Sequence, residues 1–278
     1  MRRSPRPLAF LLAALLLSAA TAHAARVDTV AVPSASMGLS VQAVVAVPDG
    51  AGPFATVYLL HGHGGGAKDW PSHLDATGGI GAFADRYGVV IVCPDGGEDS
   101  WYLDSPRDPS SRMETFVARE LPAWVEARYP VRPEGAARAI TGLSMGGHGA
   151  LLLALRYPER YAAAASMSGG VDLAQFPDRW SIARHVGPYA EDSLAWRAHS
   201  VVHLVARVDT AGLPALLVDC GVDDFFLPAN RRLHALLVER GIPHDYAERP
   251  GGHTWAYWTR ALPYHLAFFA EAFAASEE

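Results

Sequence analysis

The chain of 278 residues is poor in cysteine and in positive charge. Its only cysteines are Cys93 and Cys220, and 23 lysines and arginines stand against 29 aspartates and glutamates, for a formal net charge of −6. This acidic balance argues against nucleic acid or an anionic membrane surface as a partner. The chain also lacks internal repeats, low-complexity tracts and charged linkers. It therefore suits one large domain with a substantial core.

The N-terminus has the pattern of an export signal. Three arginines precede an apolar stretch over residues 8–20, and Ala22-His23-Ala24 matches the small-x-small pattern of a signal-peptidase site. The apolar stretch is shorter than the roughly 20 residues that span a bilayer. We therefore expect residues 1–24 to be removed and the mature domain, residues 25–278, to be secreted or periplasmic. Removal leaves 20 basic against 29 acidic residues, a formal charge of −9.

Strand-like and helix-like segments alternate along the rest of the chain. Residues 172–212 break the rhythm with mixed aromatic, charged and proline residues, which indicates a small helical insertion beside the functional site. Continuous apolar strands separated by helices predict an α/β fold, with a mostly parallel central sheet and helices on both faces. The expected strands are residues 39–47, 55–60, 89–93, 137–141, 162–167, 215–219 and 245–248, and the expected helices are residues 80–87, 110–128, 147–157, 230–240 and 255–273.

Cys93 and Cys220 each end one of these apolar strands. An oxidising compartment favours a disulfide between two cysteines. In the sheet order that we expect, however, the two strands are not neighbours. We therefore expect two buried free thiols rather than a bridge.

The pentapeptide Gly142-Leu143-Ser144-Met145-Gly146 lies between an apolar strand and a helix rich in small residues. A serine nucleophile on a strand-to-helix turn needs this context. The turn is sharp enough to strain the serine backbone, and side chains at the flanking glycines would collide with neighbouring elements. The pattern predicts that Ser144 is a nucleophile.

A serine nucleophile needs a histidine base, itself oriented by a carboxylate. In open α/β sheets the partners come from loops at the carboxyl ends of strands, and the hydrolase order places the histidine last. His253 follows Pro250-Gly251-Gly252, after the last strand, and is our candidate for the base. Four other histidines lie in predicted helices or begin a strand: His148, His234, His244 and His265.

The acid should follow the preceding strand, where the sequence reads Gly221-Val222-Asp223-Asp224. Two adjacent aspartates cannot both face the histidine from an extended turn. We choose Asp224, because it lies nearer the loop tip, before apolar residues that would anchor the loop. Asp223 is the alternative, and otherwise a turn or cap residue.

A glycine-rich loop, His61-Gly62-His63-Gly64-Gly65-Gly66, follows the second expected strand. Such a loop brings backbone N–H groups close to a reacting carbonyl, so we expect the N–H groups of His63 and Met145 to stabilise an oxyanion. The alternative is a zinc site at His61 and His63. No third ligand follows at a suitable spacing, and we expect neither a metal nor a cofactor.

Together these motifs resemble the esterase family of α/β-hydrolases, which includes esterase D, tributyrin esterases, S-formylglutathione hydrolases, feruloyl and acetyl-xylan esterases and the antigen 85 mycolyltransferases. The resemblance covers about residues 38–272. It implies Ser144 as nucleophile, Asp224 as acid, His253 as base, and oxyanion donors at His63 and Met145. The motifs are L-L-H-G-H-G-G, S-W-Y-x-D-S-P, G-L-S-M-G-G-H-G-A-L, C-G-x-D-D-F and G-G-H-x-W-x-Y-W.

The function expected from this resemblance is that of a secreted serine carboxylesterase for small or short-chain esters, including feruloyl or acetyl-carbohydrate esters. The alternatives are an acyltransferase of the antigen 85 type, an S-formylglutathione hydrolase-like thioesterase, which in the family acts in the cytosol, and a binding protein without activity. Trp70, Trp101 and Tyr102 lie in loops expected at the rim of the site. They are candidates for binding an apolar or aromatic group of the substrate, with loop packing as the alternative.

Overall fold

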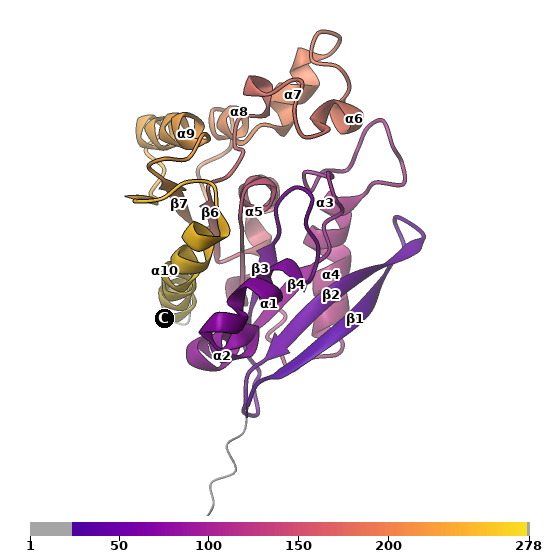
Figure 1. Ribbon diagram of the computed structural model, residues 1–278, viewed down its shortest axis with the longest axis vertical. Coiled ribbons are helices and arrows are strands. Elements are labelled where there is room, and N and C mark those ends of the chain that lie inside the picture. Colours follow the sequence, from indigo (N-terminus) through magenta and orange to yellow (C-terminus); the bar gives the residue numbers. More distant parts are fainter. Residues whose placement is uncertain (1–23, 277–278) are drawn as a thin grey trace, which may run out of the picture.

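Eight strands form one sheet in the computed structural model, which describes residues 24–276 (Figure 1). The predicted export signal lies outside these residues except for Ala24. The sheet order is β1-β2-β4-β3-β5-β6-β7-β8; β1 and β2 are antiparallel to their neighbours, and the other ladders are parallel. The strands are β1 (Arg26–Ser34), β2 (Leu39–Val47), β3 (Ala55–Leu60), β4 (Val89–Pro94), β5 (Arg138–Gly142), β6 (Ala163–Met167), β7 (Ala215–Gly221) and β8 (Asp245–Arg249).

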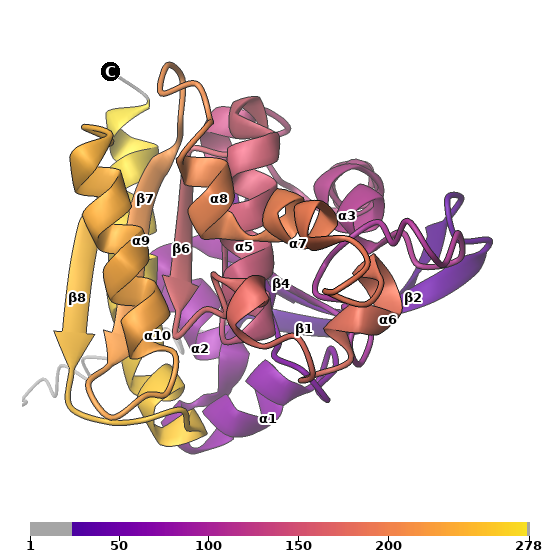
Figure 2. The same cartoon turned by 90° about the horizontal axis from the view of Figure 1, so that it is seen from above.

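Helices cover both faces of this sheet (Figures 1 and 2). In β3, Tyr58 and Leu60 pack into one apolar core with the α4, α5 and α9 helices, whereas Val57 and Leu59 pack into a second core with α1, α2 and α10. This two-sided burial is typical of a parallel α/β sheet, as predicted. The helices are α1 (Asp69–Leu74), α2 (Gly79–Tyr87), α3 (Met113–Thr115), α4 (Leu121–Glu126), α5 (Met145–Arg156), α6 (Ile182–Val186), α7 (Ser193–His199), α8 (Val201–Val205), α9 (Leu227–Glu239) and α10 (Trp255–Ala275).

Three local features differ from the sequence prediction, the first being α1, where a loop was expected around Trp70. Strand β1 was not expected, and it pairs along its whole length with β2. The helix expected over residues 110–128 is interrupted, because a π-helical turn at Phe116–Glu120 separates α3 from α4. Pro122 has no N–H to donate to a carbonyl one turn earlier, and a wider turn before it relieves that mismatch.

Residues 172–212 form the short helices α6, α7 and α8, which gather at one end of the molecule (Figure 1). Trp196 of α7 and Val202 of α8 are buried in the same core as the α5 helix. The insertion is therefore packed onto the central domain.

Cys93 and Cys220 are both buried and free, as predicted. Three strands, β3, β5 and β6, separate β4 from β7 in the sheet. Burial raises the pKa of both thiols, that of Cys220 to about 12, so both are inert packing groups.

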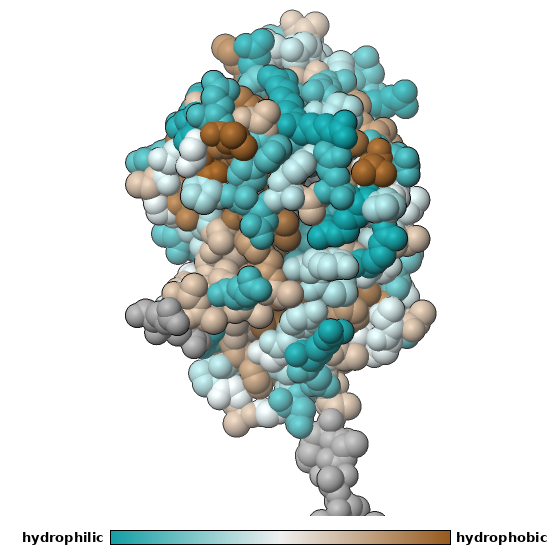
Figure 3. Space-filling model, turned by 90° about the vertical axis from the view of Figure 1, so that its left-hand side faces the viewer, coloured by the Kyte–Doolittle hydropathy of each residue, from teal (hydrophilic) through white to brown (hydrophobic). Residues whose placement is uncertain are grey.

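The surface mixes polar and apolar residues. The face drawn in Figure 3 carries only small hydrophobic patches between hydrophilic residues. Within residues 24–276, no helix combines the length and hydropathy needed to cross a membrane.

Candidate active site

Ser144 occupies the turn between β5 and α5. Its backbone has φ 55° and ψ −115°, which lies outside the regions that side-chain-bearing residues favour. A Cβ on Gly146 would lie 2.6 Å from the carbonyl oxygens of Leu60 and His61, and one on Gly142 would lie 2.7 Å from Leu60 O. The flanking glycines are therefore required by close packing against the end of β3, and the turn projects Ser144 from the end of the sheet.

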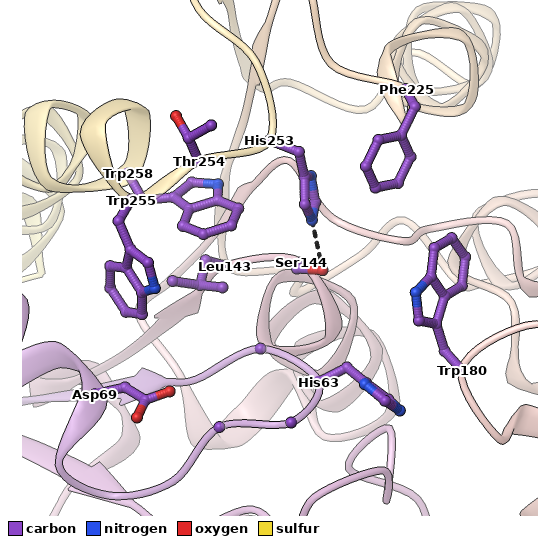
Figure 4. A pocket seen from close by; sticks show the side chains of 13 residues that line it. His63, Asp69, Leu143, Ser144, Trp180, Phe225, His253, Thr254, Trp255 and Trp258 are labelled. Carbon is purple, nitrogen blue, oxygen red and sulfur yellow. Dashed lines mark hydrogen bonds between the residues drawn. The ribbon is translucent and has the colours of Figure 1, made fainter.

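Ser144, His253 and Asp224 form a continuous hydrogen-bonded chain (Figure 4). His253 Nε2 lies 2.9 Å from Ser144 Oγ, and His253 Nδ1 lies 2.9 Å from Asp224 Oδ2 and 3.1 Å from Oδ1. A carboxylate only accepts hydrogen bonds, so Nδ1–H donates to Asp224 and Nε2 accepts the serine proton. The structure thus brings together the three side chains chosen from the sequence.

Asp224, and not Asp223, faces the histidine. Asp224 is 4% exposed, and its Oδ1 also accepts the N–H of Phe226 at 2.8 Å. Asp223 is exposed and donates its N–H to Gly251 O at 2.9 Å, which joins the acid loop to the histidine loop. Asp223 therefore acts as a turn residue that fixes the two loops relative to each other.

The other four candidate histidines, His148, His234, His244 and His265, have hydrogen-bond partners other than Ser144 Oγ. His148 is buried in α5 and bonds through Nε2 to His199 O at 2.8 Å. His265 is buried in α10 and bonds through Nδ1 to Thr141 Oγ1 at 2.9 Å. Burial lowers the pKa of His148 to about 4 and that of His265 to about 3, so both are neutral core residues.

Both ring nitrogens of His61 already have hydrogen-bond partners within the protein. The ring is buried, with Nδ1 2.7 Å from Gly62 O and Nε2 accepting the N–H of Gly96 at 2.7 Å. The His63 side chain is exposed. Both His61 nitrogens would have to give up protein partners to bind a metal, and the described residues contain no group of three potential metal ligands. The His61 and His63 side chains therefore do not fit a zinc site.

The glycine-rich loop lies directly against the nucleophile turn. A Cβ on Gly62 would lie 2.6 Å from Leu143 Cδ1 and 3.4 Å from Ser144 Cβ. The N–H groups of His63 and Met145 donate no hydrogen bond to any group among residues 24–276. Met145 is also the first residue of α5, where helix N–H groups are unpaired. Both N–H groups are available for an incoming oxygen.

An open cleft of about 560 Å³ surrounds Ser144. Figure 4 shows Trp180 and Phe225 on one side of Ser144, and Asp69, Trp255 and Trp258 on the other. The cleft is lined by Gly62, His63, Gly64, Gly65, Asp69, Leu143, Ser144, Trp180, Phe225, His253, Thr254, Trp255 and Trp258.

Trp70, Trp101 and Tyr102 do not line this cleft, and the expectation that they contact the substrate is wrong. All three are buried, Trp70 in α1 and the other two in the loop after β4. Trp70 Nε1 donates to Leu60 O at 2.9 Å, and the Tyr102 hydroxyl donates to His61 O at 3.1 Å. Trp70 and Tyr102 thus hold the start of the glycine-rich loop, and Trp101 Nε1 donates to Trp180 O at 3.0 Å, so all three have the packing role that was the alternative.

The aromatic residues that do line the cleft come from three different segments. Trp255 and Trp258 belong to the motif after His253, and Phe225 follows Asp224 and is 52% exposed, unlike the buried Phe226. Trp180 comes from the insertion and stacks on Phe225, with ring centroids 5.9 Å apart. In the sequence, proximity to the two catalytic motifs marks Trp255, Trp258 and Phe225 as residues of the cleft. Nothing in the local sequence marks Trp180.

The family described as “Putative esterase” matches residues 34–269 of this chain. An acetyl esterase from Caldicellulosiruptor saccharolyticus is 30% identical over 218 residues, which cover 74% of this chain and 80% of that protein. The S-formylglutathione hydrolase of Bos taurus is 28% identical over 68% of this chain and 74% of that protein. A diacylglycerol acyltransferase/mycolyltransferase, Ag85C of Mycobacterium avium, is 29% identical over 85% of this chain and 74% of that protein.

Solved structures show the same arrangement. A ferulic acid esterase superposes with a TM-score of 0.77 at 26% sequence identity, covering 90% of this chain and 98% of that one. The likeness therefore extends over most of the chain.

Proposed function

The chain belongs to the “Putative esterase” family, and we propose that it is an exported carboxylesterase acting through Ser144, His253 and Asp224. Membership in this family makes it a serine ester hydrolase. The observation that carries the proposal is the hydrogen-bonded chain from Ser144 through His253 to Asp224, which opens on the cleft. Serine, histidine and carboxylate in this order are the parts that nucleophilic acyl transfer requires.

The proposed mechanism has two steps. His253 removes the Ser144 proton as Oγ attacks the ester carbonyl, and Asp224 stabilises the imidazolium that forms. The imidazolium then protonates the departing alcohol, leaving an acyl-enzyme that water hydrolyses with the same base. The N–H groups of His63 and Met145 stabilise the oxyanion in both steps, each by about 3 kcal/mol.

The proposed substrates are small or short-chain esters, including acetyl or feruloyl esters of carbohydrates. The size of the cleft, about 560 Å³, and its aromatic walls support a small acyl group with an apolar or ring-shaped neighbour. The names of two relatives, an acetyl esterase and a ferulic acid esterase, support the same class.

Export is part of this proposal, with residues 1–24 as a cleaved signal. It rests on the arginine-rich start, the short apolar stretch and Ala22-His23-Ala24. Expression of the full chain in a bacterial host should yield a secreted or periplasmic protein whose N-terminal sequence begins at Ala25. A cytosolic protein that keeps Met1 would contradict it.

Acyl transfer to an acceptor other than water is the second candidate. It is favoured by the match to the mycolyltransferase over 85% of this chain. Transfer uses the same acyl-enzyme, so only the competing acceptor differs. Incubation with an acyl donor and a sugar such as trehalose would yield an acylated sugar if transfer occurs, and free acid alone if it does not.

Residues 25–278, purified, should cleave 4-nitrophenyl acetate and butyrate and should react at Ser144 with a fluorophosphonate. Ser144→Ala should abolish both reactions, and EDTA should affect neither. Assays with methyl ferulate, acetylated xylan and S-formylglutathione then show which class of ester the enzyme prefers. Wild-type turnover by Ser144→Ala would show that Ser144 is not the nucleophile.

A further inference from the structure

Among the described residues that line the cleft, Asp69 carries the only carboxylate, and none is a lysine or an arginine. The remaining lining residues are glycines, aromatic residues, Leu143, Thr254, Ser144 and two histidines, His63 and His253. The whole chain is acidic as well, with a formal net charge of −6. No lining group thus offsets the negative charge at Asp69.

The position of the Asp69 carboxylate is set by the start of α1. The Asp69 N–H donates to Gly66 O at 3.1 Å, and the side chain lies over Gly65, where a Cβ would collide with Asp69 Oδ2. The carboxylate accepts no hydrogen bond and pairs with no cation among residues 24–276. Figure 4 shows it pointing into the cleft from the start of α1, the helix that follows the loop with His63. A half-buried carboxylate without a protein partner is free to accept hydrogen bonds from a bound molecule.

Indole rings form the rest of this side of the cleft. Trp255 is held in place by His73, which stacks on it with ring centroids 3.7 Å apart and planes 6° from parallel. Trp70 packs its edge against the same ring at 5.1 Å from behind. A fixed indole beside an unpaired carboxylate suits a group with an apolar face and hydrogen-bond donors, and it repels an anion.

We propose that Asp69 is a specificity-determining residue that selects esters with a hydroxyl or ammonium group beside it and rejects esters that carry a carboxylate there. The inference rests on the proposed hydrolysis at Ser144 and deepens it by naming the charge of the substrate. Hydroxyl groups and ammonium groups share the ability to donate to a carboxylate. Esters of carbohydrates satisfy this chemistry. S-formylglutathione carries two carboxylates and one ammonium, so its net negative charge opposes it.

The test is a set of acetates of similar size and different charge, assayed at pH 7.5 by pH-stat. Propyl acetate is neutral, 2,3-dihydroxypropyl acetate donates from hydroxyls, 2-(dimethylamino)ethyl acetate carries an ammonium, and 3-acetoxypropanoate carries a carboxylate. A second pair, 4-nitrophenyl butyrate and 4-nitrophenyl hemisuccinate, places the anion on the acyl side. Each ester is measured with wild type, Asp69→Asn and Asp75→Asn. Asp75 is exposed and lies outside the cleft, so its variant removes the same charge from the same region.

In wild type, kcat/KM for the neutral ester should exceed that for the anionic ester in at least one of the two series. Asp69→Asn should narrow that ratio by about tenfold, since a single charge at close range in a half-buried site contributes an effect of this order. Asp75→Asn should leave the ratio within twofold. The hydroxyl ester and the ammonium ester are then compared. The one whose kcat/KM falls more from wild type to Asp69→Asn carries the preferred group.

Equal ratios in wild type and Asp69→Asn, in both series, would overturn the inference while leaving ester hydrolysis intact. A shift of the same size in Asp75→Asn would overturn it too, because the effect would then come from the charge of the whole protein. Failure of the wild type to cleave 4-nitrophenyl butyrate or to react with a fluorophosphonate would instead remove the proposed function, and the inference with it.

Discussion

Asp219 and Arg249 form an ion pair inside the protein, between β7 and β8. Asp219 is fully buried and also accepts the hydroxyl of Tyr257 from α10. Directly beyond the pair, Val222 donates its N–H to Arg249 O at 2.9 Å. The pair therefore joins the strand that leads to Asp224 and the strand that leads to His253. It sets the relative position of the acid loop and the histidine loop.

Replacing Asp219 by Asn should weaken both the fold and the activity. Loss of one partner from a buried ion pair leaves the other charge without compensation, which costs about 3 kcal/mol of unfolding free energy. We expect kcat/KM to fall about tenfold, because the two loops carry His253 and Asp224 and also the cleft residues Phe225 and Thr254. Urea unfolding and steady-state kinetics provide the two measurements.

The double variant Asp219→Asn/Arg249→Gln serves as the control for that experiment. It leaves no unpaired charge, so it should recover more than half of the lost unfolding free energy. A double variant no more stable than Asp219→Asn alone would show that the ion pair is not the cause.

Asp224 and Asp223 should differ sharply in their effect on catalysis. Asp224→Asn replaces a carboxylate that accepts from His253 Nδ1 with an amide that holds the ring in the wrong tautomer, so kcat should fall by about 10³- to 10⁴-fold. Asp223→Asn keeps the backbone bond to Gly251 and should stay within twofold of wild type. Hydrolysis of 4-nitrophenyl butyrate by both variants, with matched melting temperatures, separates these outcomes. The reverse order would move the acid to Asp223.

The sequence was informative about groups at strand ends. Ser144, Asp224 and His253 each follow a strand in the chain order of a hydrolase, and parallel strands bring such residues to one edge of the sheet. Glycines on both sides of Ser144 could likewise be read as steric requirements. These patterns are local, and the structure gathers the three side chains because the sheet order is simple.

The side-chain environment of the aromatic residues was not predictable in the same way. Trp101 and Tyr102 follow a strand end and look like rim residues, yet both adopt positive φ, 53° and 58°, and turn into the core. Burial here depends on which distant segments cover a loop. Trp180 is the opposite case: it lines the cleft although its local sequence does not predict this. Its position follows from how the whole insertion packs.

His148 should make the protein less stable in acid. Burial lowers its pKa in the folded protein to about 4, against an ordinary value of 6.5 in the unfolded chain. The unfolded chain thus binds more protons between these values, and stability falls as the pH drops from about 6.5 to about 4, by about 3 kcal/mol in total. Above pH 6.5 the ring is neutral in both states and the full contribution is present.

The comparison of wild type with His148→Gln isolates this effect. A glutamine amide can still donate to His199 O but does not titrate. Between pH 7 and pH 4.5, the unfolding free energy of wild type should drop by about 2 kcal/mol more than that of the variant. His265, also neutral in the core, is present in both proteins and cancels in the comparison. Parallel pH curves for the two proteins would contradict the assignment.

Tyr102 should influence catalysis from behind the cleft, without contact with the substrate. Its hydroxyl donates to His61 O, two residues before the proposed oxyanion donor His63, and its ring packs where a Cβ on Gly149 would lie 2.6 Å away. Tyr102→Phe keeps the ring and leaves that carbonyl without its partner. We expect a loss of about 1 kcal/mol in unfolding free energy and a fall of about tenfold in kcat at nearly constant KM.

Tyr157→Phe is the matched control for this change, since the Tyr157 hydroxyl donates to Glu114 Oε1 at 2.8 Å and neither residue lines the cleft. It should lose a similar amount of stability and keep wild-type kcat. The constant KM in Tyr102→Phe separates a positioning role from a binding one, because a tyrosine that touched the substrate would raise KM at constant kcat. Equal kcat in Tyr102→Phe and Tyr157→Phe would mean that the hydroxyl supports the fold alone and that His63 keeps its position without it.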